Sequence, residues 1–104
     1  MIYPSTDAEF PQVLVDYTHE KRIPRDVSYA SLTAPQVVRC DVEVDGQVVD
    51  TVWAGAGGSH SWWTPAGGKF LPPDVAPSGL AKGQRLRVIV SGPCALRLDW
   101  SPVE

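Results

Sequence analysis

The stretch from Gln36 to Gly55, QVVRCDVEVDGQVVDTVWAG, places the strongest constraint on how this chain can fold. Apolar and charged residues alternate from Val38 to Asp45, which is the two-residue period of a strand with one buried face and one wet face. Asp45-Gly46 then separates two valine-rich runs, and this dipeptide is typical of a tight turn because Gly tolerates positive φ and Asp can hydrogen-bond to its own backbone. The stretch therefore predicts a β-hairpin.

Two registers of this hairpin are compatible with the sequence. A two-residue loop at Asp45-Gly46 sets Asp41 opposite Asp50, and like charges in that position are destabilising. A three-residue loop from Val44 to Gly46, with a glycine bulge, avoids this opposition. We expect the three-residue loop.

The rest of the chain repeats the alternating pattern in short runs. Gln12–Thr18 has the pattern of a first strand, while Val27–Leu32 fits either a strand or a turn of helix. Gln84–Val90 and Ala95–Trp100 also alternate, and the turn-like residues between them predict a second hairpin. The side chains expected to face inward from this hairpin are Leu86, Val88, Val90, Leu96, Leu98 and Trp100.

Proline and glycine set the overall architecture. Ten prolines and nine glycines among 104 residues interrupt the chain too often for long helices, and the length suits a single domain. The proline-rich segment Lys69–Lys82 predicts a long connection of the kind that a Greek-key crossing needs. We therefore expect an all-β fold, a small antiparallel β-sandwich or jelly-roll-like domain spanning residues 12–104, preceded by an extended N-terminal arm, residues 1–11.

The arm carries two aromatic residues, Tyr3 and Phe10, each followed by a proline. Proline keeps such a segment extended and prevents a helix, so these rings need a surface to pack on. Either they pack on their own domain or the arm reaches a neighbouring subunit. Tyr3 and Phe10 are therefore candidate partner-binding residues.

The segment from Gly55 to Gly68 places His60, Trp62 and Trp63 within a glycine-rich frame. One interpretation is a recognition loop, because exposed aromatic residues mark binding patches. The interpretation we favour is a short strand from Ser59 to Thr64, in which adjacent tryptophans point to opposite faces. In both cases one indole lies outside the core, so His60, Trp62 and Trp63 join the candidate partner-binding residues.

Charge and hydropathy exclude several partners. The net charge is -3 and the basic residues are scattered, so the chain offers no basic stripe for nucleic acid. No run of 18 apolar residues occurs, which argues against a membrane span, and the start lacks the features of a secretory signal. We expect cytoplasmic synthesis. In that compartment Cys40 and Cys94 are expected to be reduced thiols, with a disulfide as the minority alternative.

No pattern in the sequence indicates catalysis, a metal or a cofactor. His19 and His60 are not at ligand spacing from each other or from a cysteine, and His19 begins a charged loop expected to be solvated. Ser59, His60 and Ser61 are neighbours, but the G-x-S-x-G pattern of a nucleophile elbow is absent. The glycines after Gly55 lack the Gly-Lys-Ser/Thr ending of a phosphate loop. We expect a protein that is not an enzyme and holds no cofactor.

In size, in its extended start through Tyr3-Pro4 and Phe10-Pro11, and in the all-β body ending in QRLRVIVSGPCALRLDW, the chain resembles the small jelly-roll head-decoration (cement) proteins of tailed bacteriophages. The resemblance covers the general plan of the chain and rests on no diagnostic motif. It implies a structural protein of the virion, a homo-oligomer that sits over junctions between capsid subunits and strengthens the shell.

Two other functions fit the same features. A carbohydrate-binding β-sandwich module would stack Trp53, Trp62 or Trp63 on sugar rings. A small inhibitor of a host protein would use the same exposed aromatic residues.

Overall fold

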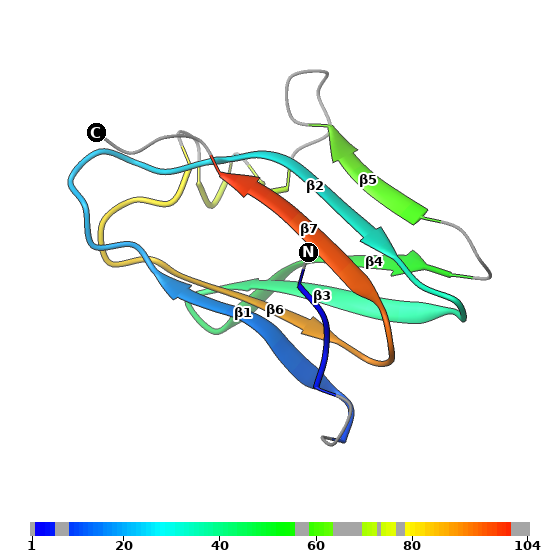
Figure 1. Ribbon diagram of the computed structural model, residues 1–104. Helices are drawn as coiled ribbons and strands as arrows, with labels where there is room; N and C mark the ends of the chain where they lie inside the picture. Colours follow the sequence, from blue (N-terminus) through cyan, green and yellow to red (C-terminus); the bar gives the residue numbers. More distant parts are fainter. Residues whose placement is uncertain are drawn as a thin grey trace.

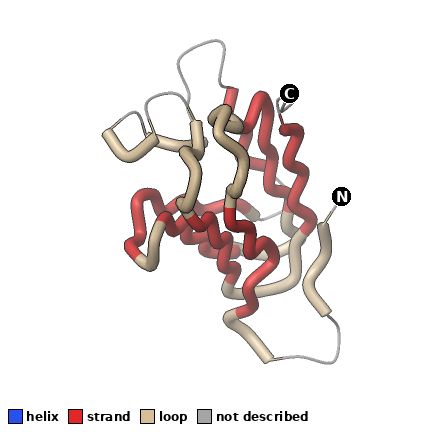
Figure 2. The backbone as a smooth tube through the Cα atoms, turned by 90° about the vertical axis from the view of Figure 1, so that its left-hand side faces the viewer, coloured by secondary structure: helices blue, strands red, loops and turns tan. Residues whose placement is uncertain are grey.

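The computed structural model describes residues 2–5, 9–55, 59–63, 70–72, 74–76 and 79–100, and for 59–63 it describes the backbone alone. These residues form two antiparallel sheets that lie face to face (Figure 1), and none of them is helical (Figure 2). The first sheet has the order β1 (Gln12–Thr18), β6 (Arg85–Val90), β3 (Val38–Val44), β4 (Gln47–Ala54). The second has the order β5 (Ser59–Trp63), β2 (Val27–Thr33), β7 (Ala95–Trp100). The expected all-β, sandwich-like fold is confirmed. The segment Val27–Leu32, for which a strand and a turn of helix were both compatible with the sequence, is a strand.

The core lies between the two sheets and follows the two-residue period. The predicted inward positions of β3 and β6 are all buried: Val38, Cys40, Val42, Val44, Leu86, Val88 and Val90. On β7, Leu96 is fully buried, whereas Leu98 and Trp100 are half-buried and pack against the edge of the core. Hydrophobic burial on alternate positions is therefore what holds the two sheets together.

The predicted hairpin of β6 and β7 is wrong. β6 pairs with β1 and β3 in the first sheet, while β7 pairs with β2 in the second. Residues 91–94 are therefore an arch that carries the chain from one sheet to the other (Figure 1). Both strands still point their apolar residues into the core, because a strand followed by an arch alternates just as a hairpin strand does.

The hairpin of β3 and β4 is confirmed, but its expected three-residue loop is wrong. Asp45 and Gly46 form a two-residue turn with φ of 54° and 81°, the positive values that a type I′ turn requires. The like-charge opposition is avoided further along, where an irregularity between Val42 and Glu43 shifts the register. Asp41 then faces Thr51, whose hydroxyl donates to Asp41 Oδ1 at 2.9 Å.

The long connection between β5 and β6 supplies part of the core. Within its described residues, Phe70 and Leu80 are fully buried. Leu80 is tied to Arg25 of the β1–β2 loop by two backbone hydrogen bonds of 3.1 and 2.8 Å. The segment therefore packs against the β1–β2 loop instead of lying free on the surface.

The expectation that His19 is solvated is wrong, because its side chain is completely buried. Its backbone exchanges hydrogen bonds with Gln84 and Gly83, at 3.0 and 2.7 Å, which draws it under the loop before β6. Nε2 donates to the carbonyl oxygen of Ile23 at 2.7 Å. Nδ1 is then the acceptor for the proton of the Tyr17 hydroxyl, which lies 2.9 Å away. A buried histidine with both nitrogens satisfied has a structural role.

Cys40 and Cys94 are free thiols, as expected, and both are buried. Burial, and to a lesser extent the nearby Cys94, raises the pKa of the Cys40 thiol to about 12, and burial also raises the pKa of Cys94. The folded protein therefore holds both groups in the protonated, unreactive form at neutral pH.

We expect neither thiol to react with 5,5′-dithiobis(2-nitrobenzoic acid) at about pH 8 while the protein is folded. A thiol whose pKa is about 12 is ionised in only about one molecule in 10,000 at that pH. In guanidinium chloride both should react at once, and the released chromophore measures the rate. Fast labelling of one thiol in the native protein would contradict the burial described above.

Candidate functional site

The N-terminal arm is held to its own domain at two points. Ile2 exchanges two backbone hydrogen bonds with Leu96 at the edge of β7, at 2.7 and 2.9 Å. The side-chain amide of Gln12 then pairs with the backbone of Ser5, accepting from its N–H and donating to its carbonyl, each at 2.9 Å. The interpretation in which the arm packs on its own domain therefore holds for its described residues.

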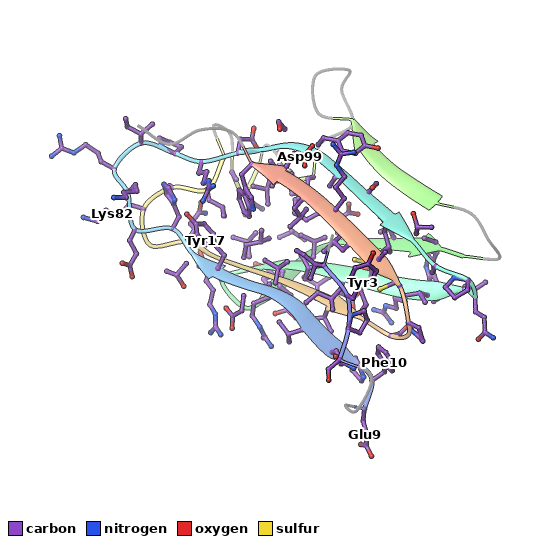
Figure 3. The ribbon with its side chains drawn as sticks, viewed as in Figure 1. Tyr3, Glu9, Phe10, Tyr17, Lys82 and Asp99 are labelled. Carbon is purple, nitrogen blue, oxygen red and sulfur yellow. The ribbon has the colours of Figure 1, made fainter. Side chains whose placement is uncertain are left out.

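The two aromatic residues of the arm have different environments. Phe10 is half-buried and packs against the core, whereas Tyr3 is 66% exposed. Figure 3 shows both at the same end of the molecule, where the arm crosses from β7 to the start of β1. Tyr3 thus stands outside the core on a segment that is fixed on either side.

Tyr3 separates two shallow apolar hollows. The first has a volume of about 470 Å³ and the second about 420 Å³. The first is lined by Tyr3, Pro4, Ser5, Phe10, Pro93 and Cys94. The second is lined by Tyr3, Thr33, Ala34, Pro35, Cys94 and Ala95. None of these side chains is charged, so this surface suits apolar side chains of a partner and not a charged ligand.

Other exposed apolar side chains gather at the same end of the sandwich, where β1, β3 and β7 begin and β2, β4 and β6 end. Val37 directly precedes β3 and is 67% exposed, and Trp53, near the end of β4, is 60% exposed. Val13, near the start of β1, is 43% exposed. We call Tyr3, Val13, Val37, Trp53 and the two hollows the arm-end surface.

The outer face of the four-stranded sheet is different, because it is crossed by ion pairs. Arg39 pairs with Asp41, Arg87 with Glu43 and Arg85 with Asp16, at 3.0, 3.4 and 2.6 Å. The hydrogen bond from Arg85 lowers the pKa of the Asp16 carboxyl. These pairs make the middle of this face polar, and most of the large exposed apolar side chains lie at the arm end, with Ile23 and Val48 at the opposite end.

The predicted residues of the glycine-rich segment are only partly placed. Ser59–Trp63 forms β5, as the favoured interpretation expected, and pairs with β2 so that Trp62 is opposite Ala30 and Trp63 opposite Tyr29. The side chains of His60, Trp62 and Trp63 lie outside the described residues. Their role in binding, and which indole is exposed, stay predictions.

The described residues contain no group of three or more His, Cys, Asp or Glu side chains arranged to hold a metal ion. None of them belongs to a helix that could cross a lipid bilayer.

Sequence reasoning found Tyr3 and Phe10 but missed Val37 and the prolines that line the hollows. Pro93 lines the first hollow and Pro35 the second, although they are far apart in the sequence, because the β6–β7 and β2–β3 connections reach the same end of the sandwich. The sequence did contain a signal for Val37: it directly precedes the inward-facing Val38, so it is an apolar residue at a position where the two-residue period expects an outward-facing polar one.

Comparisons with protein-family models, with curated proteins and with solved structures found no match to this chain.

Proposed function

We propose that this protein is a non-enzymatic interaction domain that binds a larger protein assembly through its arm-end surface. The observation that carries the proposal is the clustering of exposed apolar side chains at one end of the sandwich, beside hollows without charged lining. A patch of exposed apolar side chains next to a polar sheet face is typical of a binding site. A support that is already rigid loses little entropy on docking.

The specific form of the proposal is a component of a virion that decorates and stabilises a capsid, with a homo-oligomer as its working state. Support comes from the resemblance in plan to head-decoration proteins and from the arm, which presents Tyr3 beside prolines. In this role, burial of the arm-end surface against capsid subunits supplies the binding energy, at about 25 cal/mol for each Å² of apolar surface removed from water.

The test uses particles of the virus whose genome carries this sequence. Quantitative mass spectrometry of purified particles should find a fixed molar ratio between this protein and the capsid subunit. Particles stripped of it should bind the purified wild-type protein again. Absence from the particles would defeat the virion form of the proposal.

Two matched variants test the surface itself. Tyr3→Ala is expected to weaken binding to stripped particles by about 30-fold, because aromatic anchors at interfaces contribute about 2 kcal/mol. Val48→Ser changes a side chain that is also exposed, at 49%, but lies at the opposite end of β4, and it should bind as the wild type does. Equal binding by both variants would contradict the assignment of the arm end.

A second function is favoured by one observation, the exposure of Trp53 opposite Arg39 on the edge strand β4. An exposed indole face next to hydrogen-bonding groups suits a sugar ring. In this case a glycan panel should quench tryptophan fluorescence, and Trp53→Ala should remove the response while Tyr3→Ala preserves it.

A further inference from the structure

A half-buried arginine that has no carboxylate partner among the described residues lies at the opposite end of the sandwich from the arm. Arg25 precedes β2, and its backbone is fixed by the two hydrogen bonds to Leu80. Gly79 packs so closely beneath it that an added Cβ there would lie 2.7 Å from the Arg25 carbonyl oxygen. The position of this residue is therefore determined by the fold.

Two aromatic rings hold the Arg25 guanidinium. Its Cζ lies 4.9 Å from the ring centre of Trp100 on β7 and 5.6 Å from that of Tyr17 on β1. The two rings are themselves 5.1 Å apart, and the Tyr17 hydroxyl is fixed by its hydrogen bond to His19. Both ring faces attract a cation, so the charge is oriented before any ligand arrives.

Four other described arginines, Arg39, Arg85, Arg87 and Arg97, are paired with carboxylates, and the closest parallel to Arg25 is Arg97. Its Cζ lies 5.0 Å from the ring centre of Tyr29, and its Nε and Nη2 donate to the two oxygens of Asp99 at 3.3 and 2.8 Å. Arg97 therefore shows the complete arrangement of ring, guanidinium and carboxylate. Arg25 has the rings without the carboxylate.

The hydrogen bonds of Arg25 show where a carboxylate could approach. Nη1 makes one long contact with the Tyr17 hydroxyl, at 3.5 Å, and Nε is buried without a partner. No hydrogen bond joins Nη2 to the described residues. The edge formed by Nη1 and Nη2 is thus where we expect a carboxylate to approach.

We propose that Arg25, Tyr17 and Trp100 form a receptor for a single carboxylate group, supplied either by a small organic acid or by an acidic side chain of a protein partner. A guanidinium binds a planar carboxylate through parallel hydrogen bonds, as Arg97 binds Asp99 through Nε and Nη2. At Arg25 the buried Nε leaves Nη1 and Nη2 for the corresponding pair. The exposed Lys82 lies at the same end as Tyr17 (Figure 3), and the exposed Lys21 and Arg22 belong to the same β1–β2 loop as Arg25; these charges attract an anion. This site is independent of the arm-end surface.

The experiment is an NMR titration of the full chain at constant ionic strength. Sodium acetate replacing sodium chloride should shift the Arg25 side-chain N–H and the Trp100 indole N–H with one saturable curve, and leave the side-chain N–H of Arg97 unmoved. Arg25→Gln should abolish the shift. Arg25→Lys should weaken binding by about tenfold, because the parallel pair of charge-assisted bonds is reduced to a point contact.

Arg97→Lys is the matched control, since it alters a ring-stacked arginine whose carboxylate is already present, and it should bind acetate as the wild type does. A peptide with one glutamate between glycines, compared with its glutamine counterpart, separates the sources. Tenfold tighter binding of the glutamate peptide than of acetate assigns the site to a protein side chain, and equal binding assigns it to a small acid.

Three results would overturn the proposal: no saturable shift with acetate or the glutamate peptide, the same shift in Arg25→Gln, or tighter binding of inorganic phosphate than of either carboxylate. The indole and amide spectra of each variant report whether it is folded. If Arg25→Gln does not fold, Arg25→Lys keeps a cation over both rings and still decides the question.

Discussion

Replacing Phe70 with alanine is expected to lower the free energy of unfolding by about 3 to 5 kcal/mol, because it removes a large aromatic side chain from a close-packed core. The ring of Phe70 is fully buried and is among the largest of the fully buried side chains in the described part of the chain. Urea denaturation followed by tryptophan fluorescence measures the change.

The control is Tyr3→Ala, which removes a ring of similar size from a position that is 66% exposed. Its effect on stability should stay within about 0.5 kcal/mol, as for other surface substitutions. A loss below about 1 kcal/mol for Phe70→Ala would mean that the connection between β5 and β6 is not part of the core.

Gly55→Ala should be nearly as damaging, with an expected loss of about 3 kcal/mol or more through backbone strain. Gly55 has a φ of 145°, and a Cβ there would lie 2.2 Å from the carbonyl oxygen of Gln36 and 2.5 Å from Cα of Val37. These are backbone atoms at the entry to β3, and they cannot turn aside as a flexible side chain can. Thermal and urea unfolding give the measurement.

Gly46→Ala provides the comparison for this clash. Gly46 also has positive φ, at 81°, but no atom lies within 4 Å of the position of its Cβ. Its cost should be about 1 to 2 kcal/mol, the penalty of a left-handed conformation alone. Similar losses at both glycines would show that the contact between the end of β4 and the start of β3 is loose.

The two-residue period was sufficient to predict which side chains enter the core. Val38, Cys40, Val42 and Val44 are all buried as that period requires. It could not predict which strands are neighbours, because a strand alternates in the same way whether a hairpin or an arch follows it. The arch between Val90 and Ala95 is therefore visible only in the folded chain.

Charge opposition proved an unreliable guide to register. The sequence shows Asp41 and Asp50 close enough to meet, but it does not show that an irregularity beside Val42 can separate them. The turn itself followed the local preference for positive φ at Asp45 and Gly46. Local turn chemistry was the stronger constraint here, and the strand adjusted to it.

The candidate site was only partly predictable for a related reason. Tyr3 could be recognised because an aromatic residue on a proline-stiffened arm has few places to pack. The hollows beside it are built from connections remote in sequence, and the burial of His19 depends on backbone partners at Gly83 and Gln84. The charged residues that follow His19 in the sequence predicted a solvated side chain, whereas the side chain is buried.

The order of the strands also decides when this protein can fold during its synthesis. β1 pairs with β6, and β2 pairs with β7 on one side, so among the described strands an emerging chain has no partner for β1 until β6 has been synthesised. Before that point β3 can pair with β4, and β2 with β5. Long-range pairing of this kind slows folding and leaves apolar strands open to aggregation. We therefore expect the nascent polypeptide to depend on chaperones that shield its valine-rich strands until β6 and β7 have emerged from the ribosome.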